Sequence, residues 1–205
     1  LFNGQRISGF SFADNNTSLI AIHNEFNDSM INGSTIRGAT NLEGVLNLSK
    51  KLTGHAGVFQ NAKLLPPLLI PFGVTSLTQG AFANCTLLTG TLEIPASVVT
   101  AINSIQFANC GFDKLIWHAP KQGSNPRFTG NFGVLANMAD INLLPDEDGI
   151  KWSWSCNLIG CVESMTAAAW VNVFNQLLDL NTIGLPARTI TIGTTNLNKL
   201  TQEEK

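Results

Sequence analysis

The feature that most constrains this chain is an internal repeat. The sequence Ala-Phe-Ala-Asn-Cys at residues 81–85 returns as Gln-Phe-Ala-Asn-Cys at residues 106–110. Four prolines keep nearly the same spacing, at Pro71, Pro95, Pro120 and Pro145. Because an equal offset returns the chain to an equivalent position, such a period is typical of folds in which similar units stack on one another.

The position of Phe82 can be followed through the repeat in both directions. Phe59 lies one repeat before it, and Phe107 lies one repeat after it. Ile36 and Phe12 continue the series upstream, so that about six repeats fill residues 7–145. We expect these five side chains to stack in one buried column.

Each repeat contains a short alternating segment that ends at a proline. Examples are Leu-Glu-Ile before Pro95 and Leu-Leu-Ile before Pro71. Apolar residues at a period of two indicate a brief strand, and proline, which has no N–H, ends the hydrogen-bonded ladder. The pattern predicts an α/β repeat solenoid built mainly from short parallel β-strands, with residues 1–145 as its repeat region.

The residues between 64 and 120 carry an ordered set of elements: an apolar residue before proline at Pro71 and Pro95, Val74-x-x-Leu77, Ala-Phe at Phe82, and Asn-Cys at Cys85. This set resembles the BspA-like class of leucine-rich repeats. The resemblance covers residues 58–120 well and residues 7–57 loosely. It implies a right-handed superhelix and, because members of this class are mostly secreted or cell-surface proteins of host-associated microbes, adhesion or ligand binding without catalysis.

Two function classes follow from the resemblance. The leading interpretation is a bacterial, extracellular binding or adhesion scaffold, secreted or at the cell surface, whose partner is a host protein or glycan. The alternative is a phage tail or receptor-contact structural protein that uses the same repeats. Tail genes beside this one would favour the alternative, whereas a lipoprotein or sorting signal would favour the first.

Residues 146–205 depart from the repeat, and we interpret them as a C-terminal cap continuous with the solenoid. Apolar residues at helical spacing predict a helix over residues 165–180, with Ser164 or Thr166 as its cap. Alternation predicts a strand over residues 189–193. Thr201 and Glu204 have capping-box spacing, from which we expect the chain to continue beyond residue 205. The sequence starts at Leu1 without a charged-then-apolar leader, from which we expect that a signal peptide was either removed or never present.

The recurring Asn and Cys residues have structural interpretations. Asn61, Asn84, Asn109 and Asn137 are expected to hydrogen-bond backbone groups at tight bends between successive units. Cys85 and Cys110 occupy one repeat position, where Ala62 and Met138 also stand, and we expect buried thiols there rather than a disulfide.

A second cysteine pair, Cys156 and Cys161, leaves two interpretations open. Because only a short turn separates them, they could close a small disulfide in an oxidising compartment or stay as free thiols. Neither cysteine pair has a histidine at zinc-site spacing, so we predict no metal site there.

Composition and motifs exclude several function classes. Only 13% of residues are charged, the net charge is −2, and no basic stripe is present, so nucleic acid is not expected as a partner. No apolar run reaches the length of a membrane span. His23, His55 and His118 stand apart from nucleophile motifs, and glycine-rich nucleotide motifs are missing, which predicts no catalytic residue and no cofactor. The acidic turn at residues 146–149 is expected to be solvated, with a calcium loop as the alternative.

The expected binding face follows from the alternation in the strands. If the residue directly before each proline is buried, the residue before that one points outward, and the outward row is Leu69, Glu93, His118 and Leu143, with Asn47 and Ala21 in the earlier repeats. Glu93 and His118 should lie near enough on adjacent strands to form one polar patch. Trp152 and Trp154 offer a second candidate site, a sugar-stacking platform, unless they cover the end of the core.

Overall fold

The computed structural model describes residues 6–7, 30–31, 41, 43–47, 59–77, 80–99, 106–120, 130–131, 137–149, 151–152, 156–157, 165–177, 179 and 189–205. Several residues singled out in the sequence lie outside this set, namely Phe12, Ala21, Ile36, Trp154 and Cys161. For Asn47 and Cys156 the description covers the backbone alone.

Short strands make up most of the regular structure. In chain order the elements are β1 (Arg6–Ile7), β2 (Met30–Ile31), β3 (Glu43–Asn47), β4 (Lys63–Leu69), β5 (Thr89–Ile94), β6 (Gly111–His118), β7 (Gly130–Asn131), β8 (Asp140–Leu144), β9 (Cys156–Asn157), α1 (Ala167–Asn175), β10 (Ile190–Thr191) and α2 (Gly193–Leu197).

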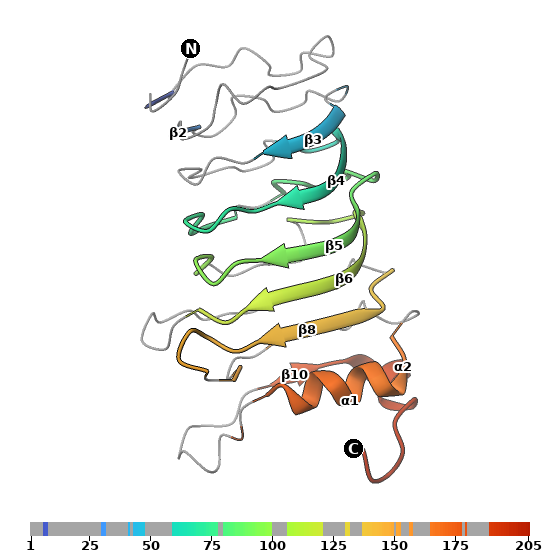
Figure 1. The fold of residues 1–205 in the computed structure, drawn as a ribbon. Helices are drawn as coiled ribbons and strands as arrows, with labels where there is room; N and C mark the ends of the chain where they lie inside the picture. The colour runs from blue at the N-terminus through green and yellow to red at the C-terminus, as the bar shows by residue number, and fades with distance from the viewer. Residues whose placement is uncertain are drawn as a thin grey trace.

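Every strand pair in the described part of the chain is parallel. The sheets have the orders β1-β2, β3-β4, β5-β6-β8 and β10-β9-β7. Figure 1 shows β3, β4, β5, β6 and β8 following one another along an elongated molecule, with their arrows pointing the same way. In the β5-β6-β8 sheet, Leu92 pairs with Leu115 and Leu115 with Ile141, so partners lie about one repeat apart in the sequence. We refer to residues 59–77, 80–99, 106–120 and 137–149 as layers 1 to 4.

Two irregularities in strand register accommodate a glycine and two prolines that a regular strand would not hold. The pairing of β5 with β6 shifts after Gly90, whose φ of +75° belongs to the left-handed region that glycine adopts without strain. The pairing of β3 with β4 shifts between Val45 and Asn47, opposite Pro66 and Pro67. Prolines are tolerated there because a bulge interrupts the ladder that proline cannot join.

The turns that precede the strands are also bonded from layer to layer. Phe59 N donates to Ala81 O at 2.9 Å, and Phe82 N donates to Gln106 O at 2.9 Å. Val99 N donates to Thr75 O at 3.0 Å on the segment after the prolines. Neighbouring layers are therefore joined along their turns and along the post-proline segments as well as along their strands.

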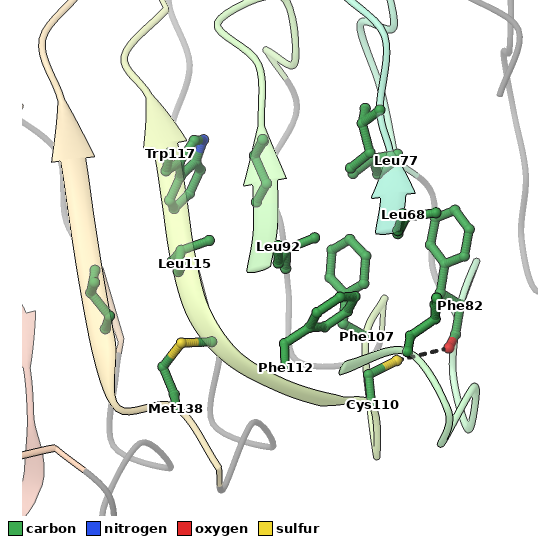
Figure 2. Packing of buried hydrophobic residues seen from close by; sticks show 14 of the residues in the cluster. Leu68, Leu77, Phe82, Leu92, Phe107, Cys110, Phe112, Leu115, Trp117 and Met138 are labelled. Atoms are coloured by element: carbon green, nitrogen blue, oxygen red, sulfur yellow. Dashed lines mark hydrogen bonds between the residues drawn. The ribbon is translucent and has the colours of Figure 1, made fainter. Parts of the chain in front are cut away.

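The core lies between the strands and these turns. Phe59, Phe82 and Phe107 are buried and stack in series, with ring centroids 5.4 and 5.6 Å apart. Figure 2 shows further side chains from adjacent layers pointing into the same interior, among them Leu92, Leu115 and Met138. Equal positions in successive layers thus contribute to one continuous core.

The helices lie at the C-terminal end of the stack (Figure 1). Thr166 caps α1, its Oγ1 accepting from Ala169 N at 3.1 Å, and α1 buries Trp170 and Val173. The helix ends at Asn175, earlier than the sequence pattern predicts. Gln176 follows directly, and its Oε1 accepts from the backbone N–H of Leu143 in β8.

The extreme C-terminus carries half of the predicted capping box. Thr201 N donates to Glu204 Oε2 at 2.7 Å, and hydrogen bonds from Thr201 lower the pKa of the Glu204 carboxyl. Neither helix in the described residues has the length and hydropathy of a membrane-spanning segment.

Candidate functional site

A concave surface lies where the strands end. One hollow of about 570 Å³ is lined by residues 68–72 of layer 1, by Glu93, Pro95 and Ala96 of layer 2, and by His118 of layer 3. A second, of about 450 Å³, shares Phe72, Ala96 and His118 and extends to residues 145–147 of layer 4. Because the two hollows share three lining residues, they form one surface feature, which we call the strand-end trough.

The register brings three of the predicted outward residues to this trough. Leu69, Glu93 and His118 all line it, at the ends of β4, β5 and β6. Their buried neighbours, such as Ile94 and Trp117, point into the core. The alternation of buried and accessible residues along β5 and β6 places Glu93 and His118 on the outer face of the sheet.

The prediction for the fourth member of this row, Leu143, is wrong. Leu143 is only 4% exposed, whereas Leu144 is 37% exposed. The register pairs Trp117 with Leu143 and His118 with Leu144. This strand offset is one position longer than the spacing of Pro120 and Pro145, so counting back from the proline selects the wrong face in layer 4.

Glu93 and His118 form a direct polar contact inside the trough. His118 Nε2 and Glu93 Oε1 are 2.8 Å apart, and both side chains remain accessible to solvent. The register pairs Glu93 with Ile116, so the carboxylate reaches diagonally along the neighbouring strand to the imidazole. The Nε2–H donates to the carboxylate, and the contact becomes an ion pair when the imidazole is protonated.

The apolar wall of the trough is formed by side chains that a folded protein would ordinarily cover. Leu69 is 52% exposed, and Phe72 is 76% exposed. Both come from layer 1, directly beside the Glu93–His118 pair. An apolar side chain beside a carboxylate and an imidazole can bind a ligand that has both apolar and polar parts.

Phe72 is a site residue that the sequence reasoning missed. It follows Pro71, and the equivalent positions after the next three prolines hold Ala96, Lys121 and Asp146. Positions that pack in the core repeat in kind, while this one changes from aromatic to small apolar to basic to acidic. That variation was the available signal that the position is not a repeated core position, and the structure exposes it at Phe72 but buries it at Asp146, which is 8% exposed.

The structure excludes Trp152 from the proposed sugar platform. Its side chain is 3% exposed and packs on Trp117, with ring centroids 4.5 Å apart. Its Nε1 donates to Leu144 O at 2.9 Å. The indole therefore covers the end of the core, which is the other interpretation offered by the sequence, and neither face of its ring is available to a ligand.

The Asn residues lie together, but their bonds differ from those expected. Asn84 Nδ2 donates to Asn61 Oδ1 at 2.8 Å, and Asn109 Nδ2 donates to Asn84 Oδ1 at 2.7 Å. The prediction that these side chains bond the backbone is wrong, because the amides bond one another. All three have φ near +60°, the left-handed conformation in which Asn is favoured over other non-glycine residues. Asn137 is exposed, and the ladder in the described residues joins Asn61, Asn84 and Asn109.

Cys85 and Cys110 are buried free thiols. Each donates to a carbonyl of the preceding layer, Cys85 to Phe59 O at 3.0 Å and Cys110 to Phe82 O at 3.2 Å, the second of which is drawn in Figure 2. Burial raises the pKa of both thiols to about 12. They are therefore protonated at neutral pH and fill the core as small apolar groups.

The acidic turn after β8 is closed by hydrogen bonds to both the side chain and the backbone of Asp146, which is buried. Asp146 Oδ1 accepts from Asp148 N at 3.0 Å, and Gly149 N donates to Asp146 O at 3.0 Å. Among the described residues, no three acidic, histidine or cysteine side chains are grouped as a metal site. This arrangement is that of a hydrogen-bonded turn that forms the far end of the trough.

Comparison of the chain with protein-family models, curated proteins and solved structures gives no match.

Proposed function

We propose that the chain is a leucine-rich-repeat solenoid of the BspA-like type, with a repeat region at residues 1–145 and a cap at residues 146–205. The support is the agreement between the sequence period and the strand partners, which lie about one repeat apart across layers 2 to 4. The serial stacking of Phe59, Phe82 and Phe107 supports the same assignment, because it places one repeat position in one column.

In this proposal the protein is a non-catalytic binding or adhesion scaffold, secreted or on the surface of a host-associated bacterium. The observation that carries the binding function is the exposure of Leu69 and Phe72 beside the Glu93–His118 pair in the strand-end trough. Contact with a partner would remove this apolar surface from water, and the adjacent polar pair would fix the orientation of the partner.

The chemistry of the trough favours binding over nucleophilic catalysis. An imidazole paired with a carboxylate serves as a general base when a hydroxyl or thiol lies on its other side. In the part of the trough that the structure describes, the lining contains no serine, threonine or cysteine. The Glu93–His118 pair is better explained as a contact surface.

The test is a binding screen with two matched double variants. The wild-type protein is applied to printed arrays of defined glycans and host-derived peptides, next to Glu93→Ala/His118→Ala and Lys114→Ala/Asp140→Ala. Lys114 and Asp140 form an exposed ion pair at 3.1 Å across β6 and β8, outside the trough lining, which makes the second variant a control for the loss of a surface pair.

We expect the wild type and the Lys114/Asp140 variant to bind the same probes, and the Glu93/His118 variant to lose them at an unchanged melting temperature. Exposed pairs contribute at most about 1 kcal/mol to stability, so both variants should fold. Equal binding by all three proteins would place the site outside the trough. A wild type that binds no probe would contradict the binding function.

A further inference from the structure

The residues that line the strand-end trough limit the class of ligand that it can bind, provided that the trough is the binding site as proposed above. It crosses the ends of β4, β5 and β6 and reaches the turn after β8. Strands in a sheet are spaced by about 4.8 Å, so three steps span about 14 Å. An extended peptide covers this length with about four residues.

The polar side chains among the described lining residues mainly accept hydrogen bonds. Pro71, Pro95 and Pro145 contribute no N–H, and the carboxylates of Glu93 and Glu147 only accept when ionised. The Nε2–H of His118 is already directed to Glu93. A ligand that carries hydrogen-bond donors would match these accepting side chains.

Among the lining residues that the structure describes, acidic side chains predominate over basic ones. Glu93 and Glu147 are exposed acidic residues in the lining, and no lysine or arginine is found among the described lining residues. Sialylated, sulfated or phosphorylated ligands would meet like charge there. A guanidinium or ammonium group would meet opposite charge and could also lie against the exposed ring of Phe72.

The apolar wall adds the second requirement. Leu69 and Phe72 leave apolar surface open beside the acidic residues, so the best ligand carries an apolar side chain close to its cation. In an extended peptide, alternate side chains point to the same face, which lets one segment present both groups. We propose that the strand-end trough binds an extended protein segment in which apolar residues are interspersed with arginine or lysine.

Three short fluorescein-labelled peptides of equal length test this proposal by fluorescence anisotropy. One repeats Leu-Ser-Arg-Ser, the second replaces Arg with Glu, and the third replaces Leu with Ser. We expect the first to bind at least about tenfold more tightly than either of the others, and its affinity to fall as salt is raised from about 50 to about 500 mM, since exposed charges are screened.

Two trough variants and one control locate the binding. Phe72→Ala and Glu93→Gln should each weaken binding of the Leu/Arg peptide about fivefold or more, while Lys114→Ala/Asp140→Ala should leave it unchanged. Circular dichroism and melting curves check that each variant is folded. Equal affinity of the Leu/Arg peptide for the wild type and both trough variants would overturn the proposal.

The failure of this proposal can be told apart from the failure of the binding function. If a neutral glycan or the Leu/Glu peptide binds and Glu93→Ala/His118→Ala abolishes that binding, the trough is a binding site but its ligand is not cationic. If neither the peptides nor the arrays bind to the wild type, both proposals are wrong.

Discussion

The rings of Phe82 and Phe107 lie parallel to within 3°, with their centroids 5.6 Å apart, although a full repeat separates them in the sequence. Phe59 stacks on the other side of Phe82 at 5.4 Å. Phe82 is therefore enclosed by equivalent residues of both neighbouring layers. Its side chain supports two layer interfaces at once.

Replacing Phe82 with Ala should therefore destabilise the protein strongly. We expect a loss of about 3 to 5 kcal/mol in the free energy of unfolding, the range for truncation of a buried Phe. Urea denaturation followed by circular dichroism measures it. Phe72→Ala is the control, because Phe72 is 76% exposed and should change stability by less than about 0.5 kcal/mol. Similar losses in the two variants would show that Phe82 is not enclosed.

The Asn ladder predicts an ordered series of stabilities. Asn84→Gly keeps the left-handed backbone but removes two amide hydrogen bonds, which should cost about 1 to 2 kcal/mol. Asn84→Ala should cost about 0.5 to 1 kcal/mol more, because Ala is strained at φ +61°. Asn137→Ala should cost little. If Ala is tolerated at position 84 as well as Gly, the left-handed conformation is not what selects Asn.

The buried thiols predict a dependence of stability on alkaline pH. In the unfolded chain a thiol ionises near pH 9, whereas Cys85 and Cys110 keep their protons to about pH 12. The unfolded state loses protons first, so stability should fall as pH rises from about 9 towards 12, by up to about 1.4 kcal/mol per thiol per pH unit.

The comparison that isolates the thiols is between the wild type and Cys85→Ala/Cys110→Ala. Urea denaturation at pH 8 and at pH 10.5 should show a smaller alkaline loss of stability in the double variant, since lysines titrate equally in both proteins. At pH 8 the two thiols should also resist labelling with iodoacetamide until the protein is unfolded. Identical alkaline losses in the two proteins would contradict the raised pKa values.

The cap of α1 gives a local prediction. Thr166→Ala removes the Oγ1 acceptor of the Ala169 N–H and should cost about 1 kcal/mol, whereas Thr166→Ser keeps an acceptor and should cost less. Thermal denaturation of the three proteins measures the difference. Equal melting temperatures for the Ala and Ser variants would mean that the hydroxyl does not stabilise the helix.

The sequence was most informative where one repeat position serves one structural purpose. The spacing of Phe59, Phe82 and Phe107 indicated a column because equal offsets place equal residues together, and the structure stacks these three rings. The same reasoning brought Glu93 to His118. It failed at Leu143, because the offset between β6 and β8 is one position longer than the offset between the prolines that follow them.

Other features depend on contacts between residues that the sequence repeat does not relate to one another. The alternation of Trp152 and Trp154 could not tell which face would be covered, and Trp117 of layer 3 decides this for Trp152 by packing against it. The exposure of Phe72 was missed because an apolar residue is usually expected in the core. The early end of α1 coincides with the bond between Gln176 and β8, two segments that are distant in the sequence.

The parallel register of layers 3 and 4 is the relationship on which the stack and the trough both depend, and cysteine cross-linking tests it most directly. Ile116 and Asn142 are partners across β6 and β8, so Ile116→Cys/Asn142→Cys should form a disulfide on mild oxidation, detected as a linked peptide by mass spectrometry. Ile116→Cys/Leu144→Cys shifts the register by two positions, to about 8 Å between Cα atoms, and should cross-link poorly. Cross-linking of the shifted pair in preference to the first, or of neither pair, would contradict the stacked parallel arrangement.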